Sequence, residues 1–245
     1  MTTSCTPQYR VEGSGPLLVY IAGLDGTGQL FFKQAPLLTH TYRVVTFRSR
    51  DNGQFTYDDL ADDVAAIIQD LGEQQATILG ESFGGTVALN FSLRYPRMVE
   101  RLVVVNSFPR FRNRLTINLG VRLASGLPFR LLWPARRAAS ILGLLVDGVN
   151  GVDRRRFWRA IRTVSAQAYL RRLQLIAELN VVSRLSEIRT PSLFVAGDRD
   201  MLISSVREAN DMAARMSNAR VRIIKGAGHA CLLGNRVRLD ELLAE

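Results

Sequence analysis

The 245-residue sequence has few cysteines and few histidines, and both shortages restrict the sites it can form. The two cysteines, Cys5 and Cys231, stand near opposite ends of the chain, and two thiols provide neither a disulfide framework nor a metal-binding cluster. We expect no metal site, and no motif indicates an organic cofactor. The only imidazoles are those of His40 and His229, so histidine chemistry has two candidates.

The sequence also lacks a long hydrophobic run and a secretion signal. No stretch approaches the roughly 18 apolar residues that span a bilayer. The first ten residues have neither the apolar core nor the basic start of a signal peptide. We therefore expect a cytoplasmic protein in a reducing setting. Hydrophobic residues make up 47% of the chain, which excludes disorder and is enough for one large domain, or one domain with an insertion.

Lysine is nearly absent, with 2 residues against 30 arginines, and the positive charge is concentrated in one region. The formal net charge is +10. Residues 108–184 hold fifteen arginines and three acidic residues, a net charge of +12, so the rest of the chain carries −2. The basicity belongs to one segment that carries no nucleic-acid-binding motif. We therefore expect no nucleic-acid partner.

Short apolar runs alternate with amphipathic stretches over most of the sequence, which is typical of parallel βα units. The pattern predicts an α/β fold with a mostly parallel, doubly wound sheet. The predicted strands are 17–21, 43–47, 76–79, 102–105, 192–196 and 221–224. The predicted helices are 29–38, one that opens at 56–60 with an acidic first turn, 84–94, 204–216 and 237–243.

One segment, 108–183, departs from this alternation. It shows helical patterns, no convincing strand, and three prolines in its first third. The simplest interpretation is a helical cap inserted into a core domain. The core domain would consist of residues 1–107 and 184–245.

The residues Gly80-Glu81-Ser82-Phe83-Gly84 have the form G-x-S-x-G between a predicted strand and a predicted helix. Such a sharp turn strains the serine backbone and leaves little room at the flanking positions, where glycine fits. The turn would lift the Ser82 hydroxyl above the strand ends, and the Phe83 amide would face a developing oxyanion. The motif predicts a nucleophilic serine. The alternative is an ordinary serine in a glycine-rich turn.

A serine becomes nucleophilic beside a base, which makes the position of the two histidines important. His229 follows the last predicted strand in a glycine-rich loop, whereas His40 precedes a strand, where a surface connection is the better interpretation. Catalytic loops leave the carboxyl ends of parallel strands, which favours His229.

The base in turn needs a carboxylate that holds the imidazole and stabilises its charged form. Asp198 and Asp200 both follow the predicted strand 192–196. The order serine, aspartate, histidine is the one expected for a hydrolase triad on a parallel sheet. Spacing alone leaves both aspartates open. A second oxyanion donor is expected in the loop after the first strand, where the Leu24 amide is the natural candidate.

Together these residues resemble the α/β-hydrolase superfamily over essentially the whole chain. Three segments carry the resemblance, namely 80–85, 196–200 and 226–229. In that family the acid usually stands three residues after the glycine of an A-G-x-x-D segment, which implies Asp200. The family commonly has His-Gly at its oxyanion loop. This chain has Ala22-Gly23 instead, which keeps the backbone donor but removes the usual histidine.

The segment Gly23-Leu-Asp-Gly-Thr-Gly28 is similar to the G-[IL]-D-G-T-G segment of the phytyl ester synthase/diacylglycerol acyltransferase-like group, which implies acyl-lipid substrates. The family's lid would correspond to the cap. Its arginines allow two interpretations. They could form a basic surface that makes weak contact with an anionic membrane or an acyl carrier, or they could simply be solvated; we favour the second.

The sequence therefore predicts a serine hydrolase that cleaves carboxylic esters, acyl lipids among them, through an acyl-enzyme on Ser82. His229 would be the base and Asp200 its acid partner, while Leu24 and Phe83 would supply the oxyanion hole. One alternative is a lipid acyltransferase that uses the same residues. Another is a ligand-binding homologue without activity. The oligomeric state stays open.

Overall fold

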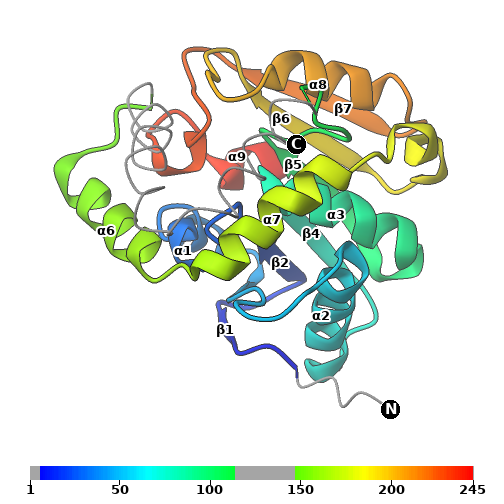
Figure 1. The fold of residues 1–245 in the computed structure, drawn as a ribbon, viewed down its shortest axis with the longest axis horizontal. Coiled ribbons are helices and arrows are strands. Elements are labelled where there is room, and N and C mark those ends of the chain that lie inside the picture. The colour runs from blue at the N-terminus through cyan, green and yellow to red at the C-terminus, as the bar shows by residue number, and fades with distance from the viewer. Residues whose placement is uncertain (1–5, 114–146, 245) are drawn as a thin grey trace.

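The computed structural model describes residues 6–113 and 147–244, and its centre is one seven-stranded sheet (Figure 1). The strands lie in the order β1-β3-β2-β4-β5-β6-β7. Only β1 runs antiparallel, against β3, and every other neighbouring pair is parallel. The mostly parallel sheet predicted from the sequence is confirmed. The strands are β1 (Tyr9–Glu12), β2 (Leu17–Ile21), β3 (Arg43–Phe47), β4 (Ala76–Glu81), β5 (Val99–Val105), β6 (Ser192–Gly197) and β7 (Ala219–Ile224).

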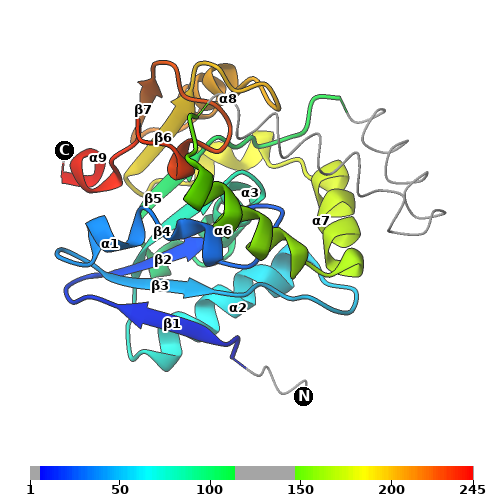
Figure 2. The same cartoon turned by 90° about the vertical axis from the view of Figure 1, so that its left-hand side faces the viewer.

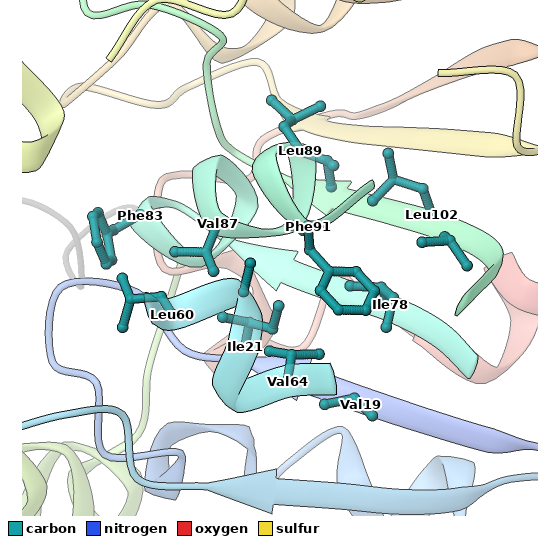
Figure 3. Packing of buried hydrophobic residues seen from close by; sticks show 14 of the residues in the cluster. Val19, Ile21, Leu60, Val64, Ile78, Phe83, Val87, Leu89, Phe91 and Leu102 are labelled. Carbon is teal, nitrogen blue, oxygen red and sulfur yellow. The ribbon is translucent and has the colours of Figure 1, made fainter. Parts of the chain in front are cut away.

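Helices cover both faces of the sheet (Figure 2). Alternate residues of β2 point to opposite faces, so Val19 and Ile21 enter one hydrophobic cluster and Leu18 and Tyr20 the other. The first cluster includes residues of α2 (Tyr57–Asp70), α3 (Phe83–Arg94) and α8 (Ser205–Ala213); the second includes residues of α1 (Ala35–Leu38) and α9 (Leu239–Ala244). Figure 3 shows the first cluster, where Phe91 and Val64 pack over the strands. Among the described residues, no helix combines the length and hydrophobicity needed to cross a bilayer.

The described part of the predicted cap contains two helices that follow β5 and precede β6 in the sequence. They are α6 (Gly151–Arg162) and α7 (Ala166–Glu178). A short 3-10 helix, Val182–Glu187, follows them. In Figure 2, α7 lies on the side toward which the arrows of β2 and β3 point. Residues 114–146 of the predicted cap lie outside the described residues. The division into a core and an inserted cap stays a prediction.

Two elements differ from the sequence prediction. The predicted helix 29–38 is two separate turns, the 3-10 helix Gln29–Phe31 and α1. Pro36 stands in the first turn of α1, where its missing N–H costs nothing. In one continuous helix 29–38, the carbonyl of residue 32 would need the N–H that Pro36 lacks, so the helix is interrupted. Strand β1 was not predicted. Three of its four residues are exposed, so it carries no hydrophobic pattern, and its pairing with β3 alone makes it a strand.

Candidate active site

Ser82 occupies a strained turn between β4 and α3. Its φ is +53° and its ψ is −119°, and its amide donates to the Val105 carbonyl at 2.9 Å. The neighbouring glycines make the turn sterically possible. A Cβ on Gly84 would lie 2.0 Å from the Ile21 carbonyl oxygen, and one on Gly80 would lie 2.3 Å from the Gly84 carbonyl oxygen. The G-x-S-x-G spacing therefore has a direct steric cause.

The structure brings the three predicted triad residues into one chain of hydrogen bonds. The Ser82 Oγ lies 2.9 Å from His229 Nε2, and His229 Nδ1 lies 2.7 Å from Asp200 Oδ2. These residues follow the carboxyl ends of β4, β7 and β6 respectively. Parallel strands end at one edge of the sheet, which is why residues far apart in the sequence meet here.

The structure separates the two aspartates that the spacing left open. Asp200 is 1% exposed at its side chain, and its Oδ1 accepts hydrogen bonds from the Leu202 and Ile203 amides. Ser205 also donates to its Oδ2. Asp198 is exposed and accepts a hydrogen bond from the Gly226 amide at 2.6 Å. Asp200 is the aspartate beside the histidine.

The electrostatics of the pair favour an ion pair once the imidazole is protonated. Burial lowers the pKa of His229, but the hydrogen bond and the negative charge of Asp200 outweigh it and hold the pKa above 6.5. Burial raises the pKa of Asp200, yet hydrogen bonds from His229, Ser205 and the Leu202 amide bring it below 3.8. The other histidine, His40, is exposed near the end of α1.

The loop after β2 lies directly against the serine. A Cβ placed on Gly23 would be 3.5 Å from the Ser82 Cβ, and a turn closed by the Gly26 amide and the Gly23 carbonyl carries Leu24. Phe83 is the first residue of α3, so its amide is one of those with no acceptor inside the helix. Both predicted oxyanion donors, Leu24 and Phe83, therefore belong to segments that flank Ser82.

A cavity of about 160 Å³ opens onto Ser82 and His229. Its walls come from the loop after β2, from the histidine loop and from the helices α6 and α7. Most of its side chains are apolar, while Asp25 and Glu81 add two carboxyl groups. The apolar or aromatic wall residues are Leu24, Leu30, Phe157, Ile161, Tyr169, Leu202, Ala230 and Leu233.

Three polar side chains around the site were not predicted from the sequence. Among the described residues other than glycine, only Ser82 and Asn106 have positive φ. Asn106 accepts from the Gly197 amide and donates to the Gly228 and His229 carbonyls, so it joins the acid loop to the histidine loop. A polar residue directly after a predicted strand was the available signal.

The other two missed groups are an acid and an arginine. Glu81 accepts a hydrogen bond from the Tyr20 hydroxyl at 2.7 Å, and burial raises the pKa of its carboxyl group to about 7. Arg172 is fully buried beneath the loop that carries Leu24. Glu81 fills a variable position of the G-x-S-x-G motif and Arg172 stands in no motif, so the sequence offered no signal for the role of either.

Comparison with known proteins finds a matching family model and similar proteins. A family model described as "Alpha/beta hydrolase family" matches residues 18–241. The chain is similar to "Putative carbamate hydrolase RutD" of Serratia proteamaculans, with 26% identity over 93% of this chain and 89% of that protein.

Solved structures agree in fold. A hydrolase from Pseudomonas aeruginosa superposes with a TM-score of 0.79 at 23% identity, over 91% of this chain and 86% of the other. The enol-lactonase from Burkholderia xenovorans superposes with a TM-score of 0.77 at 19% identity, over 91% and 89%. The fold is thus shared with these proteins.

Proposed function

Because the chain belongs to the alpha/beta hydrolase family and is a hydrolase, we propose that it cleaves carboxylic esters of short acyl groups through an acyl-enzyme on Ser82. The observation that carries the proposal is the hydrogen-bonded chain Ser82–His229–Asp200 at the mouth of an apolar cavity. Nucleophile, base and orienting acid are the parts that such a reaction needs.

In the proposed reaction, His229 Nε2 accepts the Ser82 hydroxyl proton while the Ser82 Oγ forms a bond to the ester carbonyl carbon. The amides of Leu24 and Phe83 donate to the resulting oxyanion. The imidazolium then gives its proton to the leaving alkoxide oxygen, and the carbon–oxygen bond breaks. Water repeats the sequence on the acyl-enzyme, with His229 again as base, and releases the acid and free Ser82.

The size of the cavity supports short acyl groups. Ligand pockets in proteins usually measure about 300–1,000 Å³, so a cavity of about 160 Å³ is a small one. A short acyl group suits a cavity of this size, and a long acyl chain would have to extend beyond the described walls. The predicted acyl-lipid substrates would therefore require space outside this cavity.

A panel of p-nitrophenyl esters from acetate to palmitate tests the proposal, with labelling by a fluorophosphonate probe. We expect kcat/KM to be highest for two to four acyl carbons, and the probe to label wild-type protein at Ser82. Ser82→Ala should abolish both signals. Full turnover in the folded Ser82→Ala variant would overturn the mechanism, and an unlabelled wild-type protein would favour the non-catalytic alternative.

The relatives named carbamate hydrolases favour a second candidate, the cleavage of carbamates at the same serine. Attack at the carbonyl carbon and stabilisation of the oxyanion would be unchanged. The rates of phenol release from phenyl carbamate and from phenyl acetate separate the two candidates. Both substrates have the same leaving group, and they differ in the acyl group left on Ser82, which carries nitrogen only for the carbamate. A higher kcat/KM for phenyl carbamate would make carbamates the preferred class.

The acyltransferase alternative uses the same acyl-enzyme but replaces water with an alcohol. Adding a long-chain alcohol to a p-nitrophenyl ester reaction distinguishes the two outcomes. The proposed hydrolase forms the free acid. A dominant new ester product would instead identify acyl transfer.

A further inference from the structure

Arg172 is a charged residue in the apolar stripe of a cap helix. The buried residues of α7 are Ala168, Arg172, Leu175 and Ile176, spaced as one face of a helix. The Arg172 side chain is 0% exposed. Burying a guanidinium is costly in free energy unless its N–H groups find acceptors, so its contacts indicate why it is there.

The guanidinium binds main-chain carbonyls. Its Nη1 donates to the Leu24 carbonyl at 3.2 Å and to the Asp25 carbonyl at 3.3 Å, and its Nη2 donates to the Arg50 carbonyl at 2.9 Å. The nearest recorded carboxylate oxygen, on Asp51, is 3.8 Å away, too far for a hydrogen bond. Within the described residues Nε has no acceptor. This arrangement is a clamp on two loops, those after β2 and β3.

Gly26 shows how closely the loop after β2 fits the guanidinium. Its φ is +61°, and a Cβ at this position would lie 2.2 Å from Arg172 Nη2. The loop therefore packs its backbone directly on the arginine. Ala22, at the start of the same loop, has no polar side chain that could brace it.

We propose that Arg172 is a positioning residue that holds the Leu24 amide toward the oxyanion. The guanidinium fixes the carbonyls of Leu24 and Asp25, and with them the turn Gly23–Gly26 whose face carries the Leu24 N–H. The same helix places Tyr169 in the cavity wall, so the seating of α7 sets both the substrate wall and the oxyanion donor. This inference rests on the proposed function.

Arg172→Met tests the proposal, because methionine is long and apolar but offers no donor. Losing an oxyanion donor costs about 100- to 1000-fold in kcat, and loosening one should cost about 10- to 100-fold. We expect that loss in kcat on a short p-nitrophenyl ester, with KM changed less than about threefold since ground-state contacts persist. Arg171→Met is the matched control, because Arg171 binds the Phe55 carbonyl and Glu178 and should leave kcat within about twofold.

Two further readouts distinguish positioning from folding. A trifluoromethyl ketone forms a hemiketal oxyanion on the serine, so its affinity should fall in Arg172→Met by about the same factor as kcat/KM. In Arg172→Ala, guanidinium chloride at non-denaturing concentration should restore part of kcat, whereas sodium chloride should not. Arg172→Lys, which has one donor centre in place of a planar fork, should lie between wild type and Arg172→Met.

The outcomes separate the two proposals. If wild-type protein neither cleaves an ester nor takes the fluorophosphonate label, the proposed function and this role of Arg172 both fail. If wild-type protein does both and folded Arg172→Met or Arg172→Lys matches its kcat, the role of Arg172 alone is overturned. A loss of ketone affinity no larger than that in Arg171→Met would overturn it as well.

Discussion

The side-chain amide of Asn106 donates a hydrogen bond of 3.0 Å to the main-chain carbonyl of His229. The same amide donates to the Gly228 carbonyl, while the Asn106 carbonyl oxygen accepts from the Gly197 amide. Asn106 follows β5 at a positive φ of +45°, a conformation that asparagine tolerates better than most residues. One side chain therefore fixes the loop that carries His229 relative to the loop that follows β6 and carries Asp200.

Asn106→Ala should reduce both stability and turnover. Three hydrogen bonds to main-chain groups and one to the Cys231 sulfur are lost, and buried backbone groups are left unsatisfied, which should cost about 1–3 kcal/mol in the free energy of unfolding. The freed histidine loop should lower kcat by about tenfold, because small misplacements of a catalytic group are expensive. Asn90→Ala is the control, since among the described residues the Asn90 side chain hydrogen-bonds only to the Thr86 carbonyl within α3. Urea unfolding and ester kinetics measure both effects; equal kcat in the two variants would contradict the role of Asn106.

The two aspartates of the loop after β6 should differ sharply in their effect on rate. Asp200→Asn keeps the shape of the side chain but favours the wrong imidazole tautomer, which should lower kcat by about 10³- to 10⁴-fold. Asp198→Asn, at an exposed turn, should stay within about threefold of wild type. Comparable losses in both variants would remove Asp200 from the proposed triad.

The pH dependence of kcat/KM should follow His229. A general base must be neutral, and Asp200 holds the pKa of His229 above 6.5, so activity should rise with pH and reach half its plateau above pH 6.5. Asp200→Asn removes the negative charge and should move that midpoint to lower pH. Rates measured from pH 5 to 9 on one ester test both statements. A midpoint below 6.5 in wild type would contradict them.

Much of the fold could be predicted because the central strands of the sheet are buried on both faces. Predicted strands 17–21 and 43–47 match β2 and β3, because continuous apolar runs bounded by turn residues carry a strong signal. The exposed strand β1 carries none, and only its partner defines it. Pro36 divides the predicted helix 29–38 in a way that its apolar residues do not reveal.

The residues of the site could also be predicted only where the sequence carries a strong local signal. Ser82 and His229 could be predicted because a sharp turn and a scarce residue type leave marks in the sequence. The choice of Asp200 over Asp198 needed a family resemblance, since both aspartates follow the same strand. Arg172 could not be found, because a helical pattern places a charged residue on the solvated face. Its acceptors are carbonyls, which any residue type supplies.

Glu81 makes the stability of the protein depend on pH in an unusual direction. Burial raises the pKa of its carboxyl group from 4.5 to about 7, although the Tyr20 hydroxyl and the charge of His229 oppose the shift. The folded protein then binds more protons than the unfolded chain between these pH values. The contribution of Glu81 to the free energy of unfolding therefore falls as pH rises from 4.5 to 7, by about 3 kcal/mol in total.

Glu81→Gln should remove this dependence, because an amide cannot ionise and can still accept the Tyr20 hydrogen bond. The variant should gain stability relative to wild type as pH rises from 4.5 to 7, and hold that advantage above pH 7, by up to about 3 kcal/mol. Tyr20→Phe should have the opposite effect, because loss of the hydrogen-bond donor raises the pKa of Glu81 further. The free energy of unfolding should then keep falling to a higher pH than in wild type. Urea unfolding at pH 5, 6, 7 and 8 gives the difference curves. If the free energies of unfolding of Glu81→Gln and wild type differ by a constant amount across this pH range, the carboxyl group of Glu81 does not titrate as the structure indicates.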